Sequence, residues 1–516
     1  MSGSVLRKQR PGTAFRVVLG LSFLFYLWYA CQLPYTHDDW EWGLAAGMRH
    51  LLTADVNSRY AGNLVEVLVT RSALLKNLVI ALVMTGIPLS SLCLVLRFCE
   101  GERQRLAPLL LAAANLLQLC TIRLIWQETY GWIAGFSNFA VSAPLVNVFH
   151  LLLADAFLRR ERPKGWRLPA RFLFGLSLQL FLENIAVYAL LLMLACLAVK
   201  ALRRLRVTGG DWALLLGLAS GTALMFSSGI YATLLHTGSA VGGYRQLTFS
   251  LSDGPLSIAF SLLKRFLILF PPSLWAASTV PVCAALLGLA ALLLQSGRRG
   301  GWPLAALNAA LALYVLFVCF FGEFGRLRLA SSWWSNALSA LMGLVIGLVV
   351  VLEIVLLWRT EAKTLCFALF CWLSRPALML PMAAITNADP RCFLTTDVML
   401  APFVLLVLSR LWLTLPSARR RPASLVAGVL LCAALLHVLL PFAAIGRLSR
   451  QRDALIRAAR EHPGETLLLP AYPEALQELL WKPDPLSPES AYTDYFRAFY
   501  RIPPDTPLRF ESWEQS

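Results

Sequence analysis

The sequence predicts an all-α protein that crosses a membrane many times, with about 13 transmembrane helices. Three observations lead to this prediction. The 516-residue chain is 58% hydrophobic and only 15% charged, with a mean hydropathy of +0.64. Several apolar runs approach the roughly 20 residues that a helix needs to cross a bilayer. Between these runs, Lys and Arg collect in alternate connections, as the positive-inside rule requires.

The N-terminal part predicts one span followed by a long loop. Residues 14–33 form the first apolar run, and the basic segment before it places the N-terminus in the cytoplasm. No small-residue cleavage site follows, so we expect a retained span rather than a removed signal peptide. The external loop, residues 34–76, contains two segments with helical periodicity, 41–52 and 60–68. Each has a polar and an apolar side, which is typical of helices in the membrane interface.

The rest of the transmembrane part follows from alternating apolar runs and polar connections. We expect residues 255–272 to lie in the interface, because Lys264 and Arg265 interrupt that apolar run. The remaining predicted spans and connections are residues 77–96, 107–123 and 140–157, a hairpin of two spans around 183–184, residues 211–231, a span from about 274, two pairs of spans that bracket 323–336 and 387–391, and residues 423–442.

The C-terminal part changes in character. Residues 449–461 have the pattern of an amphipathic helix, and residues 465–470 that of a short buried strand. The rest of this part is rich in Pro, Tyr and acidic residues. We therefore expect a transmembrane domain over residues 1–445 and a small periplasmic α/β domain, residues 446–516, docked on it.

The composition excludes several classes of function. The net charge of +17 arises from basic loops of a membrane protein, and no interleaved aromatic pattern points to a nucleic-acid partner. The 11 cysteines are scattered without metal-ligand spacing, so we interpret them as small core residues. No H-E-x-x-H, Walker or G-x-G-x-x-G pattern is present, which argues against a zinc protease of that type and a nucleotide-driven pump.

Two adjacent carboxylates follow the first span. Asp38 and Asp39 are flanked by His37 and Trp40, where the chain leaves the hydrocarbon. Unpaired carboxylates are costly in a membrane and need water, a cation or a polar pocket. A carboxylate at this boundary can act as a general base that takes a proton from an attacking hydroxyl. The alternative is structural, because an Asp at the start of a helix caps its N-terminus. The sequence does not decide between the two acids.

Several arginines are expected on the same external face. They are Arg59, Arg245, Arg326, Arg328 and Arg391. The planar guanidinium fork of Arg suits a phosphate group, because it can hold two oxygens at once. The alternatives for each Arg are contact with lipid headgroups and a structural ion pair. Arg59 and Arg391 are the better candidates for a substrate phosphate.

A third stretch, residues 127–138, combines aromatic side chains with an acid and an amide. Glu128, Trp132 and Asn138 are its candidate binding residues. Flat aromatic faces and hydrogen-bond acceptors are what a sugar-binding surface needs. The alternative is the aromatic belt found at membrane interfaces. The pair Glu183–Asn184 is equally well explained as a hairpin turn.

Four short patches resemble one family of membrane enzymes. They are Asp-Asp-Trp-Glu-Trp at 38–42, Ser-Arg-Tyr-Ala-Gly-Asn at 58–63, the aromatic segment 130–139 and Pro-Arg-Cys-Phe at 390–393. Their order on one membrane face resembles the C-type (GT-C) glycosyltransferases, which include protein O-mannosyltransferases and lipid A aminoarabinose transferases. The chain is most similar to poorly characterised bacterial members with a DD-x-W motif followed by G-R-Y-x-G-N. Ser58 stands where glycine is more usual.

The resemblance implies an inverting transfer of a sugar from a polyprenyl-phosphate donor to a cell-envelope glycan or lipid, on the periplasmic face of a bacterial inner membrane. It implies that Asp38 or Asp39 is the base and that arginines neutralise the leaving phosphate. Residues expected to bind the substrates are His37, Trp40, Arg59, Tyr60, Asn63, Glu128, Trp132, Asn138 and Arg391. No cofactor is expected; a divalent metal at Asp38 and Asp39 is the alternative, although the sequence offers no further ligand set. The other expected partners are membrane lipids.

Two other functions compete with this one. A lipid-linked glycan flippase or another transporter would place charged residues or broken helices at the bilayer midplane, whereas this chain crowds its polar residues on one face. A polysaccharide polymerase or ligase would carry its main catalytic loop late in the chain rather than after the first span.

Overall fold

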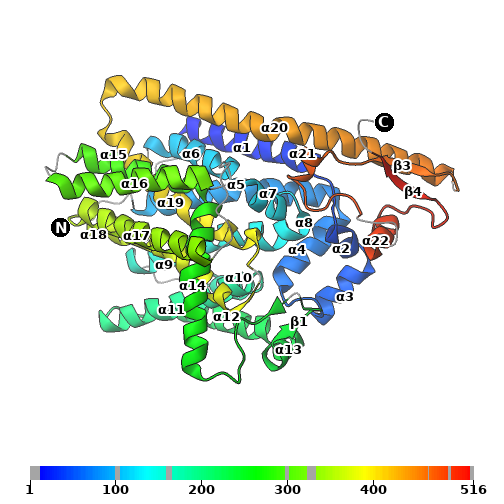
Figure 1. Ribbon diagram of the computed structural model, residues 1–516, viewed down its shortest axis with the longest axis horizontal. Coiled ribbons are helices and arrows are strands. Elements are labelled where there is room, and N and C mark those ends of the chain that lie inside the picture. The colour runs from blue at the N-terminus through cyan, green and yellow to red at the C-terminus, as the bar shows by residue number, and fades with distance from the viewer. Residues whose placement is uncertain are drawn as a thin grey trace.

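The computed structural model describes residues 12–98, 105–158, 165–243, 245–296, 301–321, 333–386, 388–462, 464–485 and 490–511. Most long helices lie side by side along the long axis of the molecule, and α14 runs across them (Figure 1). The helices are α1 (Thr13–Gln32), α2 (Asp38–Gly43), α3 (Ala45–Thr53), α4 (Tyr60–Arg71), α5 (Ala73–Phe98), α6 (Ala107–Leu119), α7 (Arg123–Thr129), α8 (Ile133–Gly135), η2 (Phe136–Ala140), α9 (Val141–Leu158), α10 (Arg167–Gln179), α11 (Glu183–Leu202), α12 (Gly209–Phe226), α13 (Gly229–Thr237), α14 (Pro255–Ala277), α15 (Thr279–Gln295), α16 (Gly301–Phe321), α17 (Trp333–Trp358), α18 (Ala362–Met379), η3 (Leu380–Ala384), η4 (Pro390–Phe393), α19 (Leu394–Thr414), α20 (Ser417–Glu461), α21 (Glu474–Gln477) and α22 (Ala491–Phe499).

The predicted class, an all-α multi-pass membrane protein, agrees with this architecture. Within the described ranges, ten helices are long and apolar enough to cross a membrane, or up to eleven if a bent pair counts as one span. The shorter helix α15 is also apolar. The expected number of about 13 crossings stays a prediction.

Three elements differ from the expected spans. The run at 107–123 is broken, because α6 and α7 meet at an angle of 89°. The helix that ends at Leu158 starts at Ile133, earlier than expected, and passes through the π-helical turn η2. Helix α14 continues through Lys264 and Arg265 instead of ending before a new span. Arg265 hydrogen-bonds to the carbonyl oxygen of Thr386, which gives this cation a polar partner within the fold.

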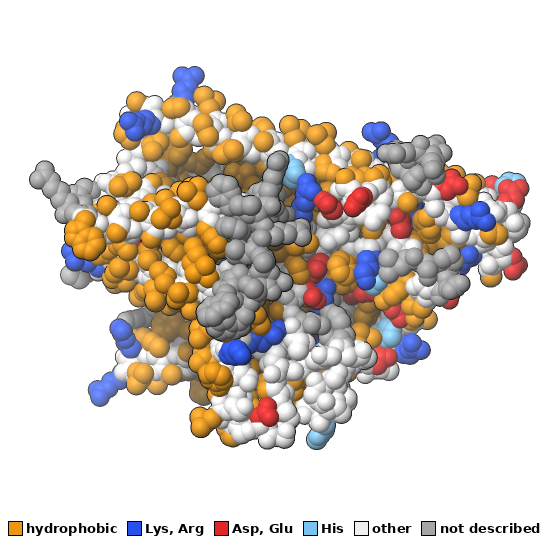
Figure 2. All heavy atoms as spheres, in the orientation of Figure 1, with side chains coloured by type: hydrophobic (Ala, Val, Ile, Leu, Met, Phe, Trp, Pro, Cys, Tyr) orange, Lys and Arg blue, Asp and Glu red, His pale blue; other side chains and the backbone are white. Residues whose placement is uncertain are grey.

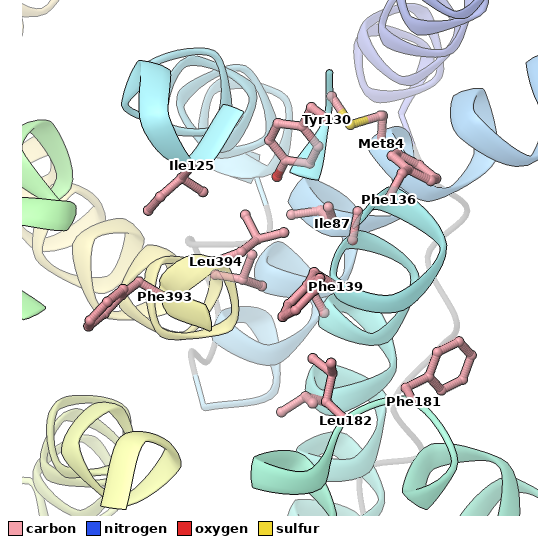
Figure 3. Packing of buried hydrophobic residues seen from close by; sticks show 14 of the residues in the cluster. Met84, Ile87, Ile125, Tyr130, Phe136, Phe139, Phe181, Leu182, Phe393 and Leu394 are labelled. Atoms are coloured by element: carbon pink, nitrogen blue, oxygen red, sulfur yellow. The ribbon is translucent and has the colours of Figure 1, made fainter. Parts of the chain in front are cut away.

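The core has its centre on α19, of which 89% is buried over the most apolar stretch. One apolar cluster surrounds its middle, including Leu400, Phe403 and Val404. A second lies around its start and includes Phe139 and Leu394. Figure 3 shows Phe139 among Ile87, Leu394 and Leu182, side chains contributed by different segments of the chain. This packing fixes the start of the helix over residues 133–158 against α5 and α19.

The first loop folds into α2, α3 and α4. A break at Leu44 separates α2 from α3, and Arg71 at the end of α4 satisfies carbonyl groups there. Its guanidinium donates to the carbonyl oxygen of Trp42 at 2.9 Å and to that of Leu44 at 2.5 Å. Helix ends leave carbonyl groups without intrahelical partners, so this arginine joins the two ends of the loop.

The C-terminal segment packs on the first loop. Helix α20 has 45 residues and runs without a break through the expected domain boundary at 445/446. The expected strand forms as β3 (Leu467–Pro470), and it pairs in parallel with β4 (Leu508–Glu511), which the sequence did not predict. Trp40 of α2 shares an apolar cluster with Leu469 and Phe496. Strands β1 (Ser239–Ala240) and β2 (Arg245–Gln246) form a separate hairpin.

Candidate functional site

Helices α2 and α4 and the start of the helix at Ile133 come together in the right half of the molecule in Figure 1. Helix α4 packs so closely that a Cβ atom at Gly62 would lie 2.1 Å from Oδ1 of Asn138. The polar side of α4 faces inward. Asn63 and Glu66 are each 1% exposed, whereas Leu64 and Leu68 on the other side are about half exposed. Helix α4 is therefore amphipathic, with its apolar side facing outward and its polar side facing the interior of the protein.

Asp39 is fully buried and positions the backbone. Its Oδ2 accepts a hydrogen bond from the amide of Thr36 at 2.8 Å, and its Oδ1 accepts one from the amide of Ala134 at 2.9 Å. Ala134 lies in the first turn of the helix at Ile133, where amides have no intrahelical partner. Burial raises the pKa of Asp39 to about 8, although these hydrogen bonds oppose the rise. The carboxylate of Asp39 thus caps the N-terminus of the helix at Ile133, which is distant from Asp39 in sequence.

Asp38 has a different environment. Its side chain is 27% exposed and contacts Nδ1 of His37. The His37 ring stacks on Tyr492 of the C-terminal segment, with ring centroids 3.9 Å apart. His37 has a positive φ of 45°, an uncommon conformation that turns the chain into α2. Asp38 is therefore held beside an imidazole and stays accessible to solvent.

Glu66 adds a further carboxyl to this end of the molecule. Burial raises its pKa well above the ordinary value, and the nearby charges of Asp39, Asp38 and Glu41 raise it further. Its Oε1 is buried without a hydrogen-bond partner among the described residues. Burial and neighbouring negative charge therefore both disfavour the ionised form of Glu66.

Two of the predicted arginines share one carboxylate. Arg59 donates to Oε2 of Glu183 from Nε at 3.1 Å and from a terminal nitrogen at 2.9 Å. Arg245 approaches Oε1 of the same carboxylate at 3.1 Å, and Tyr231 donates to it at 2.8 Å. Glu183, which the sequence explained equally well as part of a turn, is the acceptor that holds both arginines.

Arg391, from a later segment of the chain, lies near Arg59. It pairs with Asp389, and its guanidinium lies 3.4 Å from Oε2 of Glu128. Its Cζ is 5.7 Å from the centre of the Trp132 ring and 5.9 Å from that of Phe139, and Cζ of Arg59 lies 5.6 Å from the same Phe139 ring. Two cations from distant segments therefore flank one aromatic side chain. Arg326 and Arg328 lie outside the described residues.

An aromatic group joins the site to the C-terminal segment. Trp132 stacks on Trp481 with centroids 5.5 Å apart, and His37 meets Trp481 edge-on at 6.5 Å. The indole N–H of Trp132 is buried without a described partner. Neither Trp481 nor Tyr492 is among the binding residues that the sequence predicts. The signal for Trp481 in the sequence is a large aromatic residue beside Lys482 in a tail that is otherwise polar and rich in Pro.

The other expected binding residues differ in position. Trp40 is buried against Phe496 and donates to the carbonyl oxygen of Tyr35, so its contacts are those of a packing residue. Tyr60 is partly buried at the start of α4. Asn63 and Asn138 are buried, and each has a side-chain carbonyl oxygen without a described partner.

No group of three or more His, Cys, Asp or Glu residues within the described ranges could hold a metal ion. Comparisons of the chain with family models, curated proteins and solved structures found no match.

Proposed function

We propose that this protein is an inverting glycosyltransferase of the GT-C type. It moves a sugar from a polyprenyl-phosphate donor to a hydroxyl group of a cell-envelope glycan or lipid, at the periplasmic face of a bacterial inner membrane. The observation that supports this best is the meeting of Arg59 and Arg391 at Phe139. One of these expected phosphate-binding residues, Arg391, also lies beside the expected sugar-binding residue Trp132.

The arginines bind the donor phosphate. A guanidinium carries several N–H donors in one plane, so it can hold a carboxylate and a phosphate oxygen at the same time. Glu183 and Glu128 orient Arg59 and Arg391 before the donor arrives. Their positive charges stabilise the phosphate as its bond to the sugar breaks, which is where charge develops in the transition state.

Asp38 acts as the general base. It accepts the proton of the acceptor hydroxyl while the hydroxyl oxygen attacks the anomeric carbon, and the electron pair of the breaking C–O bond leaves with the phosphate. Asp38 suits this role because its side chain is partly exposed. Both oxygens of Asp39 accept main-chain hydrogen bonds, so Asp39 positions the loop instead.

The aromatic rings and amides bind sugar. The stacked pair Trp132 and Trp481 offers flat faces for sugar C–H groups. The carbonyl oxygens of Asn63 and Asn138 are acceptors that sugar hydroxyls can satisfy. Buried polar groups in a folded protein normally have partners, and a bound ligand is one way to supply them.

One observation favours the transporter alternative. Arg375 of α18 donates to the hydroxyl of Ser278 at 3.0 Å, and Ser278 hydrogen-bonds to Asp397 of α19. All three residues are buried within the apolar part of the bundle. Charged groups at this depth are a feature of transport pathways.

A two-armed assay separates these functions. Membranes containing the protein are given radiolabelled polyprenyl-phosphate hexose or pentose, and labelled glycan or lipid product is measured. Vesicles containing the purified chain are tested in parallel for movement of the labelled lipid across the bilayer. We expect the wild type to form product. Arg391→Gln should lower product formation at least about tenfold, and Arg375→Gln should leave it unchanged. Lipid movement that depends on Arg375, without any product, would establish the transporter.

A further inference from the structure

Helix α22 of the C-terminal segment packs against α2 (Figure 1). The ring of Phe496 meets that of Trp40 edge-on, with centroids 5.0 Å apart. The contact at the end of α2 is tight, because a Cβ atom at Gly43 would lie 2.3 Å from Cε2 of Phe499. Side-chain packing therefore fixes the position of α22 relative to α2.

Two tyrosines of α22 reach the acidic side of α2. The side chain of Tyr492 hydrogen-bonds to Asp38, and that of Tyr495 hydrogen-bonds to Glu41. In each helix the two residues are three positions apart, and this spacing places side chains on one face. The hydroxyl of Ser490 accepts a hydrogen bond from the amide of Tyr492 at 3.2 Å, which fixes the first turn of α22. Each tyrosine is thus matched to a different acid.

Tyr492 also holds the imidazole that lies beside Asp38. The rings of His37 and Tyr492 stack with centroids 3.9 Å apart and an angle of 25° between their planes. Nδ1 of His37 contacts Oδ1 of Asp38. A stacked ring restricts the rotation of the imidazole, so this nitrogen stays directed at the carboxyl group. Tyr492 therefore acts on Asp38 in two ways, directly through its hydroxyl and indirectly through His37.

The hydroxyl of Tyr492 is the donor in its contact with Asp38. Burial, followed by the charge of Asp38 and the hydrogen bond to it, raises the pKa of Tyr492. The phenol therefore keeps its proton at neutral pH. A hydrogen bond donated to a carboxylate favours the ionised form, and the ionised form is the one that can take a proton from a hydroxyl.

The acids around Asp38 act in the opposite direction. Among the described residues, the ionisable groups near it are His37, Asp39 and Glu41 on its own segment, Glu66 on α4 and Tyr492 on α22. Negative charge on a neighbouring acid disfavours a second ionised carboxylate. The hydrogen bond from Tyr492 opposes this repulsion.

We propose that Tyr492 is a positioning residue of the transferase, which holds Asp38 in its ionised form and, through His37, in a fixed orientation toward the acceptor hydroxyl. The phenol touches the base and not the reacting atoms, and it donates a hydrogen bond without giving up its proton. The C-terminal segment is then part of the active site. This inference rests on the proposed function, because it gives Tyr492 a task only if Asp38 is the base.

The first test compares the pH dependence of sugar transfer by the wild type, Tyr492→Phe and Tyr495→Phe. Phe keeps the ring that stacks on His37 and removes only the hydroxyl. We expect the acidic limb of the kcat/KM profile to move up by about one pH unit in Tyr492→Phe, because a hydrogen bond to a charged group is lost. Tyr495→Phe removes a hydroxyl of the same helix that bonds to Glu41 instead, so it should keep the wild-type limb.

The second test does not depend on activity. A water-soluble carbodiimide with glycinamide modifies protonated carboxyl groups, and peptide mass spectrometry measures the modification of Asp38 as the pH is varied. We expect the midpoint of modification to rise by about one pH unit in Tyr492→Phe and to stay unchanged in Tyr495→Phe.

The two tests separate this inference from the proposed function. An unshifted midpoint in Tyr492→Phe overturns the inference whether or not the wild type transfers sugar. An unshifted acidic limb beside an active wild type overturns it as well and leaves the transferase in place. A shifted midpoint with no sugar transfer by the wild type would instead overturn the proposed function.

Discussion

Asp38 and Asp39 are neighbours in the chain, but the fold gives them different chemistry. Asp39 accepts amide hydrogen bonds from its own loop and from the helix at Ile133, and it is fully buried. Asp38 keeps part of its surface in solvent beside His37. The sequence predicted the pair as the candidate centre but could not separate their environments, because the partner amide of Ala134 is distant in sequence.

The raised pKa of Asp39 predicts a pH dependence of stability. Its ordinary value is 3.8, and the folded protein raises it to about 8 through burial. The folded state therefore holds a proton that the unfolded chain gives up, so this contribution is full below about pH 4 and is lost as the pH rises to about 8.

We expect the apparent melting temperature in detergent to fall over this range by several degrees more for the wild type than for Asp39→Asn, which cannot ionise. Asp505→Asn, at an exposed position of the tail, is the control. A wild-type curve parallel to that of Asp39→Asn would contradict the assignment of a buried, proton-holding Asp39.

At the scale of elements, α2, α3 and α4 act as one unit. His50 of α3 lies between two acids, with its Nε2 3.0 Å from Glu41 and its Nδ1 2.7 Å from Asp55. Burial lowers the pKa of His50, but the hydrogen bonds and charges of Glu41 and Asp55 outweigh burial and raise it above 6.5.

This arrangement predicts that His50 stabilises the loop mainly in acid. The stabilisation is full below the unfolded pKa of about 6.5 and is lost as the pH rises through the higher folded value. We expect His50→Gln to lower the melting temperature by a few degrees at pH 5.5 and by much less at pH 9. A deficit that is the same at both pH values would rule out the charged imidazole as its cause.

The close contact between α4 and η2 predicts that one added methyl group at Gly62 lowers both stability and activity. Gly62→Ala would place a Cβ 2.1 Å from Oδ1 and 3.2 Å from Cα of Asn138, so the Asn138 side chain must move and its backbone must give slightly. We expect a loss of about 1–3 kcal/mol of stability together with weaker activity. Gly20→Ala on α1, where the added Cβ meets nothing within 4 Å, is the matched control. Equal behaviour of the two variants would mean that α4 does not position the site.

At the scale of the whole molecule, the two ends differ in charge. Lys and Arg side chains stand out at the left end of the face in Figure 2, and Asp and Glu side chains gather toward the right end. Exposed arginines lie at one set of helix ends: Arg203 and Arg204 follow α11, and Arg419 lies in the first turn of α20. Under the positive-inside rule, this distribution supports our proposal that the candidate site and the C-terminal segment lie outside.

This orientation predicts opposite accessibility of two exposed positions. In intact cells, a membrane-impermeant maleimide should label Asp505→Cys, in the C-terminal segment, above the wild-type background. Arg204→Cys, in the connection between α11 and α12, should be labelled only after the membrane is permeabilised. The reverse pattern would place the site in the cytoplasm.

The sequence predicted those features that depend on local patterns. The apolar run of α1, the amphipathic α4 and the short strand β3 each follow from hydrophobic periodicity. Strand β4 has four residues in a Pro-rich tail, and it is held by pairing with β3 and by packing against side chains that are distant in sequence, such as Phe496. The stacking of Trp132 on Trp481 and the sharing of Glu183 by Arg59 and Arg245 are long-range contacts. No periodic pattern records such contacts.

The central claim is that Asp38 is the base of a sugar transfer. The most direct test is transfer of radiolabelled sugar from a polyprenyl-phosphate donor by membranes with matched amounts of the wild type, Asp38→Asn and Asp505→Asn. We predict that Asp38→Asn loses at least about 100-fold in rate with an unchanged melting temperature, while Asp505→Asn keeps full activity. Wild-type rates in a folded Asp38→Asn protein would contradict the account.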